Sequence, residues 1–251
     1  MELSLTYELM ALLFAVGLLA GCIDAIAGGG GMITLPVLLF VGLSPAQALA
    51  TNKLQGSFGS FSASLYFVRR GLVDLRRIGM MVLCTFVGAA LGAVLVQQID
   101  PSFLTAVIPV LLILIALYFW FSPRMGEDDV QQRMGPLSFA LSVGFGVGFY
   151  DGFFGPGTGS FFAIAFVSLL GFGLTKATAH TKVLNFTSNI ASLLFFILGG
   201  QVVWTFGLVM AGGQLLGGRL GASLVVLKGS ALIRPLIVCI CIAMSLKLLL
   251  N

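Results

Sequence analysis

Long apolar runs separated by short polar loops fill almost the whole chain. They lie at approximately 9–27, 32–43, 47–68, 78–97, 103–121, 136–153, 159–171, 178–198, 203–226 and 231–250. A helix needs about 20 apolar residues to cross a bilayer, so the longer runs predict membrane-spanning helices. Two of the runs, 32–43 and 159–171, are too short to cross as straight helices. The pattern predicts an all-α polytopic membrane protein with about 8–10 membrane segments.

Composition supports lipid as the solvent of this chain. Hydrophobic residues make up 59% and charged residues only 9% of the sequence, whereas soluble domains have roughly 25% charged residues. The net charge is +4, but the basic residues lie in short loops, where they act as topology signals rather than as a nucleic-acid surface. The four cysteines lie in apolar runs without histidine at ligand spacing, so we expect no metal site and no cofactor.

The chain reads as two related halves. Asp24, Gly28 and Gly30 align at one constant offset with Asp151, Gly155 and Gly157. After a shift of two residues the match continues through the two lysines, Lys53 and Lys182, and through glycines and alanines on either side of them. We therefore predict a first transmembrane repeat at 1–122, a cytoplasmic linker at 123–135 and a second transmembrane repeat at 136–251.

Loop charge predicts how the halves are oriented. The loop after 47–68 contains Arg69, Arg70, Arg76 and Arg77, while the equivalent loop at 199–201 contains no basic residue. Because basic loops are cytoplasmic, equivalent loops face opposite sides, which indicates inverted-topology repeats with both termini periplasmic. Such halves need an odd number of crossings each. Five segments per half, or three crossings plus a re-entrant pair, both satisfy this condition.

A few ionisable residues lie inside the apolar runs, and each costs about 3 kcal/mol or more at the bilayer centre unless it is paired or hydrated. An aspartate and a lysine recur in both halves, as Asp24 and Lys53 and as Asp151 and Lys182. This repetition predicts a site at the interface of the halves. The aspartates are candidates for proton coupling, or they hold the lysines in place.

Glycine-rich breaks precede both short runs. Glycine lets the backbone unwind, and a helix that restarts there presents free N–H groups that favour an anion. Discontinuous helices at matching places are typical of transporter binding sites; the alternative is that these glycines only permit packing or a turn. The substrate-binding candidates from the breaks are Gly28, Gly29, Gly30, Gly31, Gly155, Gly157 and Thr158.

The residues around each lysine complete the predicted site. Hydroxyl and amide side chains beside an ammonium group suit an oxyanion, and the candidates are Thr51, Asn52, Lys53, Gln55, His180, Thr181, Lys182 and Asn185. Two alternatives stay open for the lysines: each snorkels to a membrane surface, or each pairs with the aspartate of its own half. His180 is either a hydrogen-bonded core residue or a proton relay.

Four stretches resemble the TauE/SafE family, also called the sulfite exporter or toluene sulfonate uptake family, and in particular its YfcA-like branch. They are 24–31 (DAIAGGGG), 48–55 (ALATNKLQ), 151–159 (DGFFGPGTG) and 177–182 (ATAHTK). The resemblance covers essentially the whole chain. It implies a secondary transporter of the bacterial cytoplasmic (inner) membrane that moves sulfur-containing anions such as sulfite or organosulfonates, driven by protons. We expect transport by alternating access.

Other functions fit the sequence less well. A passive anion channel would use the same polar groups to line a pore. An intramembrane hydrolase would need a Gly-x-Gly-Asp element or a Gly-x-Ser-Gly element, and both are missing from this sequence, so we expect no enzyme. The expected partners are a small anionic substrate and the lipid bilayer, without nucleic acid. Whether the protein forms a homo-oligomer is left open.

Overall fold

The computed structural model describes residues 6–100, 102–103 and 128–228, and this part of the chain is helical without any strand. The predicted run 231–250, almost all of run 103–121, both termini and the predicted boundary at 122 lie outside the described residues. The helices are α1 (Tyr7–Ala27), α2 (Gly30–Phe40), α3 (Pro45–Arg69), α4 (Gly79–Val96), α6 (Pro136–Phe139), the π-helical turn η1 (Ala140–Gly144), α7 (Phe145–Phe153), α8 (Thr158–Leu170), α9 (Leu174–Leu198) and α10 (Trp204–Lys228).

Four of these helices, α1, α4, α9 and α10, are long and apolar enough to cross a membrane. Helix α3 is also 25 residues long, but it is less apolar because serine and amide side chains occupy much of its buried face. It begins with Pro45 after a capping box in which Ser44 and Gln47 satisfy each other's backbone N–H groups. The all-α architecture predicted from the apolar runs is confirmed.

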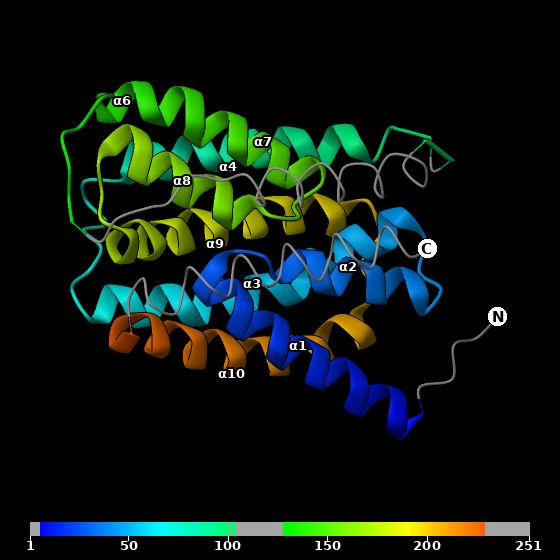
Figure 1. Cartoon of the computed structure of the whole chain (residues 1–251). Coiled ribbons are helices and arrows are strands. Elements are labelled where there is room, and N and C mark those ends of the chain that lie inside the picture. The colour runs from blue at the N-terminus through cyan, green and yellow to red at the C-terminus, as the bar shows by residue number, and fades with distance from the viewer. Residues whose placement is uncertain (1–5, 101, 104–127, 229–251) are drawn as a thin grey trace, which may run out of the picture.

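Helices α1 and α10 lie side by side and run in the same direction (Figure 1). A Cβ atom on Gly17 would lie 3.0 Å from the Cα of Met210, and one on Gly21 would lie 2.9 Å from the Cα of Gln214. Helices α4 and α7 form a second parallel pair, in which a Cβ on Gly148 would lie 2.9 Å from the Cα of Thr85. Small residues thus let backbones approach closely where lipid removes the hydrophobic drive for association.

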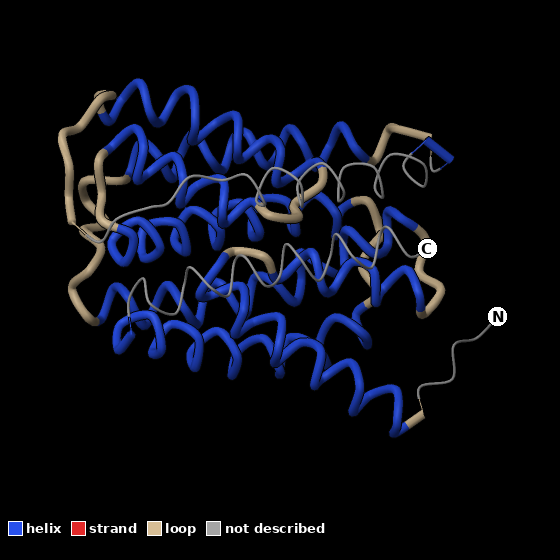
Figure 2. The backbone as a smooth tube through the Cα atoms, in the orientation of Figure 1, coloured by secondary structure: helices blue, strands red, loops and turns tan. Residues whose placement is uncertain are grey.

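Both glycine breaks are turns after which a short helix goes back along the molecule. Helix α1 ends at Gly28 in the left-handed conformation (φ 78°), and α2 returns to the end of the molecule at which α1 began (Figures 1 and 2). Helix α7 ends before Gly155 and Gly157 (φ 94° and 78°). Helix α8 then returns to the end of the molecule from which α7 came, which is opposite the end where α1 began. The two short helices, of 11 and 13 residues, are both shorter than a straight crossing needs.

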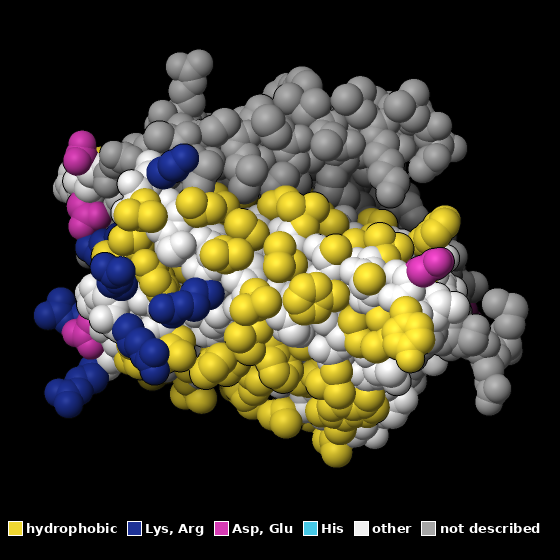
Figure 3. Space-filling model, turned by 90° about the horizontal axis from the view of Figure 1, so that it is seen from below, with side chains coloured by type: hydrophobic (Ala, Val, Ile, Leu, Met, Phe, Trp, Pro, Cys, Tyr) yellow, Lys and Arg dark blue, Asp and Glu magenta, His cyan; other side chains and the backbone are white. Residues whose placement is uncertain are grey.

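Basic residues gather at one end of the molecule. Figure 3 shows a belt of exposed apolar side chains with most lysine and arginine side chains beyond one edge of it. The exposed arginines of the α3–α4 loop lie there, and so does the segment before α6, where Arg133 donates its backbone N–H to Leu169 O at the end of α8. The start of α1 lies at the other end (Figure 1). An apolar belt with charge beyond its edge is typical of a multi-pass membrane protein.

Candidate functional site

The two glycine breaks, which are about half the chain apart in sequence, touch each other. A Cβ on Gly28 would lie 2.6 Å from the Cα of Gly159, so only glycine permits this approach. The hydroxyl of Ser160, in the first turn of α8, donates a hydrogen bond to the carbonyl of Ala27, at the end of α1. The breaks therefore form one junction, and helices α3 and α9 pack against each other beside it.

Each buried lysine forms an ion pair with the aspartate of the other half. Lys53 Nζ on α3 lies 2.8 Å from Asp151 Oδ1 on α7, and Lys182 Nζ on α9 lies 3.0 Å from Asp24 Oδ2 on α1. Both lysine side chains are only 1% exposed. The alternatives of snorkelling and of pairing within one half are therefore wrong, because packing of α7 on α4 and of α1 on α10 places each acid against the other half.

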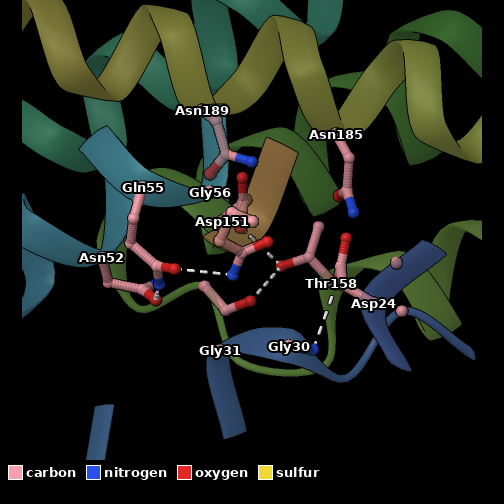
Figure 4. A pocket seen from close by; sticks show the side chains of 14 residues that line it. Asp24, Gly30, Gly31, Asn52, Gln55, Gly56, Asp151, Thr158, Asn185 and Asn189 are labelled. Atoms are coloured by element: carbon pink, nitrogen blue, oxygen red, sulfur yellow. Dashed lines mark hydrogen bonds between the residues drawn. The ribbon is translucent and has the colours of Figure 1, made fainter. Parts of the chain in front are cut away.

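A small pocket of about 30 Å³ lies at the junction of the breaks, with room for roughly two water molecules. Figure 4 shows side chains from both halves converging on it, with Asp24 and Asp151 among them. Its lining residues are Asp24, Gly28, Gly30, Gly31, Asn52, Gln55, Gly56, Asp151, Gly155, Thr158, Gly159, Asn185, Asn189 and Gln214.

Neutral amides form one wall of this pocket as a connected chain. Asn52 Oδ1 accepts hydrogen bonds from the Thr34 hydroxyl (2.6 Å) and from Gln55 Nε2 (2.7 Å). Gln55 Oε1 in turn accepts from Gln214 Nε2 at 2.6 Å, which links α3 to α10. Such a chain fixes the orientation of each amide, so the wall presents defined donors and acceptors to a ligand.

The structure brings ten of the seventeen predicted site residues to the pocket. The other seven do not line it: Gly29, Thr51, Lys53, Gly157, His180, Thr181 and Lys182. The two lysines contact the lining instead: Lys53 Nζ lies against Asp151 Oδ1 and close to Gly155, where a Cβ would lie 3.0 Å from Lys53 Nζ. The substrate-binding roles of fifteen of these residues and the proton-coupling role of Asp24 and Asp151 stay predictions.

His180 lies away from the pocket, toward the basic end of the molecule. Its Nδ1 lies 2.8 Å from the carbonyl oxygen of Lys176, and its ring packs against Phe166 and Phe172. Thr51, its counterpart in the first half, accepts a hydrogen bond from the backbone N–H of Val203. The hydrogen bond and the ring contacts of His180 agree with its interpretation as a hydrogen-bonded core residue.

Sequence reasoning missed four neutral residues of the pocket, Gly56, Gly159, Asn189 and Gln214. The predicted site was based on ionisable groups, on the glycine breaks and on residues adjacent to the lysines. Neutral amides inside apolar runs were an available signal, since an amide also needs a hydrogen-bond partner away from water. Among the described residues no group of three histidine, cysteine or acidic side chains could hold a metal ion.

The comparisons with known proteins identify the family of this chain. The family described as "Sulfite exporter TauE/SafE" matches residues 13–248. The chain belongs to the TauE/SafE family. It is 56% identical to "Probable membrane transporter protein YfcA" of Escherichia coli (strain K12) over 241 residues, which is 96% of this chain and 90% of that protein.

A "Probable membrane transporter protein" of Haemophilus influenzae is 52% identical, with 96% of this chain and 94% of that protein covered. A "Sulfite exporter TauE/SafE family protein 6" of Arabidopsis thaliana is 30% identical over 45% of this chain and 27% of that protein. No solved structure matches the chain. The resemblance to the TauE/SafE family and its YfcA-like branch is thus confirmed, and the protein is a multi-pass membrane transporter of this family.

Proposed function

We propose that this TauE/SafE protein is a secondary transporter that moves a small anion across the bacterial cytoplasmic membrane, with the pocket at the two breaks as its binding site. The observation that supports this most directly is that two buried Lys–Asp pairs, both crossing between the halves, flank a polar pocket lined by two glycine breaks. Helix N-termini at a buried pocket favour an anion, and the family description supports a sulfur-containing one, such as sulfite or an organosulfonate.

The two halves are proposed to be inverted-topology repeats with re-entrant hairpins. Support comes from helix direction: α1 runs parallel to α10, α7 runs parallel to α4, and the hairpins α1–α2 and α7–α8 enter from opposite ends. Since the basic end is expected to be cytoplasmic, the start of α1 then lies on the periplasmic side. The proposed domain division at 1–122, 123–135 and 136–251 follows from this repeat.

Alternating access is the mechanism that such a site favours. Each ion pair joins an α3 or α9 lysine to a hairpin of the other half. A rocking motion that keeps both pairs intact changes the exposure of the pocket and leaves no buried charge without a partner. Proton coupling through an aspartate would then supply the driving force. The size of the pocket favours an anion of few atoms, and a larger organosulfonate would require a wider state of the site.

Flux into proteoliposomes tests the proposal. The purified protein is screened with sulfite, methanesulfonate and other small anions, with and without a pH gradient. We expect saturable flux of at least one anion that responds to the pH gradient; flux that does not saturate and follows only the membrane potential would indicate a channel and overturn the carrier.

The lysine double variant Lys53→Gln/Lys182→Gln is expected to lose anion flux; flux is measured per amount of folded protein, because each substitution also removes one member of a buried ion pair. Lys176→Gln is the matched control, because Lys176 is a partly exposed lysine whose partner, Asp129, lies outside the pocket. Wild-type flux in the double variant would remove the lysines from the mechanism.

A further inference from the structure

The two Lys–Asp pairs differ in how they satisfy the carboxylate. Both oxygens of Asp24 have donors: Oδ1 accepts the backbone N–H of Gly30 at 3.2 Å, and Oδ2 accepts Lys182 Nζ at 3.0 Å. Lys182 Nζ also donates to the main-chain carbonyl of Asp24. Asp24 therefore offers this ammonium group two acceptor oxygens, and neither carboxylate oxygen of the Asp24–Lys182 pair lacks a donor.

Asp151 directs both of its donors to a single oxygen. Its Oδ1 accepts Lys53 Nζ at 2.8 Å and the Thr158 hydroxyl at 2.7 Å. Its Oδ2 has no hydrogen-bond partner in the described part of the chain, although the residue is only 3% exposed and lines the pocket. An ionised carboxylate oxygen without a donor is costly when buried, whereas a proton on it removes the charge and makes it a donor.

Charge balance indicates when that proton is needed. Asp24, Lys53, Asp151 and Lys182 together sum to zero. An anion that enters alone would leave a net negative charge deep in the membrane protein, which is expensive. One monovalent anion together with one proton on Asp151 Oδ2 restores a sum of zero. A divalent anion would need a second proton, and Asp24 has no oxygen without a donor to receive it.

We propose that Asp151 is the single proton carrier of the site, that one proton accompanies one monovalent oxyanion, and that the Asp24–Lys182 pair stays ionised throughout. This deepens the proposed function and rests on the pocket being an anion site. A hydronium ion on the open side gives up a proton to Asp151 and becomes water, an Oδ2–H bond forms, and this O–H donates a hydrogen bond to an oxygen of the anion. When the site faces the other side, the Oδ2–H bond breaks and water there takes the proton.

The surroundings of Asp151 allow this exchange. The charged groups that face it are Lys53 on α3 and, around the same pocket, Asp24 on α1 with its partner Lys182 on α9. The adjacent Tyr150 donates its hydroxyl to the carbonyl of Pro156, and α4 presents alanine and glycine to α7. After protonation of Asp151, Lys53 has no ion-pair partner left among the described residues, so its ammonium charge is available to stabilise the anion.

Infrared difference spectroscopy of the protein in nanodiscs tests the proposal without requiring flux. The measured signal is the C=O band of a protonated buried carboxylic acid, recorded between pH 9 and pH 4. We expect this band in the wild type and in Asp24→Asn, and its loss in Asp151→Asn. A band that survives Asp151→Asn, or that disappears in Asp24→Asn instead, would overturn the assignment.

Two hydroxyl variants keep the test decisive if an aspartate variant does not fold. Thr158→Val removes a donor to the ionised form of Asp151, so at a fixed pH its protonated fraction should exceed that of the wild type. Thr34→Val is the matched control, because its hydroxyl donates to Asn52 and Gly30 and contacts neither carboxylate. Equal bands in Thr158→Val and the wild type would contradict the proposal.

Two anions of fixed charge test the ligand class. At a fixed pH, methanesulfonate, which is monovalent, should strengthen the Asp151 band, and sulfate, which is divalent, should not. Strengthening by sulfate alone, or by neither anion, overturns the coupling of one proton to one monovalent oxyanion. Failure of the proposed function would look different: no anion would be transported in proteoliposomes, while the carboxyl band would still depend on Asp151.

Discussion

The crossed ion pairs predict a specific energetic coupling between α3 and α7. Lys53→Gln leaves Asp151 charged and without its partner at a site where the two side chains are 1% and 4% exposed. Removing one member of a buried pair costs about 3–5 kcal/mol. For a chain of this length we expect the unfolding midpoint to fall by roughly 10 °C. The double variant Lys53→Gln/Asp151→Asn places two neutral hydrogen-bonding groups there and should lose about 2 kcal/mol less than the sum of the single variants.

Thermal unfolding in one detergent at pH 8, followed by the fluorescence of a thiol-reactive or environment-sensitive dye, measures these differences. The matched control is Lys53→Gln/Asp24→Asn, which combines a lysine and an aspartate of the same half. Lys53 forms its ion pair with Asp151 and not with Asp24. The losses in unfolding free energy of Lys53→Gln and Asp24→Asn should therefore add much more nearly in this control. Additive effects in Lys53→Gln/Asp151→Asn, or equal coupling in both double variants, would refute the crossed pairing.

Three further outcomes follow from the packing and the loops. Gly152→Val should disrupt the α4–α7 contact and lower the unfolding midpoint sharply, because a Cβ there would lie 2.9 Å from the Cα of Ala89; Gly146→Val, on the same helix, should not, because no atom of the described residues lies within 4 Å of a Cβ there. A cysteine at position 70 should be protected from an impermeant thiol reagent added from the periplasmic side, while one at position 201 should be labelled; labelling of both would reject the inverted topology. The Lys176 ammonium, with the Gly173 N–H, lowers the pKa of Asp129, so this contact should be present above about pH 4 and lost as the pH falls through the folded-state pKa. Hydrogen exchange at the Gly173 amide, corrected for intrinsic rates, should therefore accelerate in acid; unchanged protection would contradict the ion pair.

Local features of the sequence predicted most of the helical architecture. Apolar runs gave the positions of the long helices, and the lengths of runs 32–43 and 159–171 excluded straight crossings by the segments that became α2 and α8. The glycine breaks were identifiable because positive φ angles, as at Gly28 and Gly155, require glycine. The sequence left open whether the breaks join separate crossings or hairpins that turn back, because run length does not give the direction of the next helix.

The partners of the charged residues depended on tertiary structure. The apolar runs placed Asp24, Lys53, Asp151 and Lys182 inside the membrane segments, but they could not show that each lysine bonds to the aspartate of the other half. That pairing depends on the packing of helices more than 90 residues apart in the chain, which no local pattern encodes.

The amide wall of the pocket and the Asp151 oxygen without a donor also depended on tertiary structure. Gln214 reaches the pocket only because Gly17 and Gly21 allow α10 to approach α1. Aligned positions in the two halves also have different side chains, such as Gly31 and Thr158, and this difference directs the donors of Asp151 to one oxygen. The sequence by itself determined which residues are buried in the membrane segments. Only the packing of the halves decided which of them face one another, because side-chain contacts are set by distances in space and not along the chain.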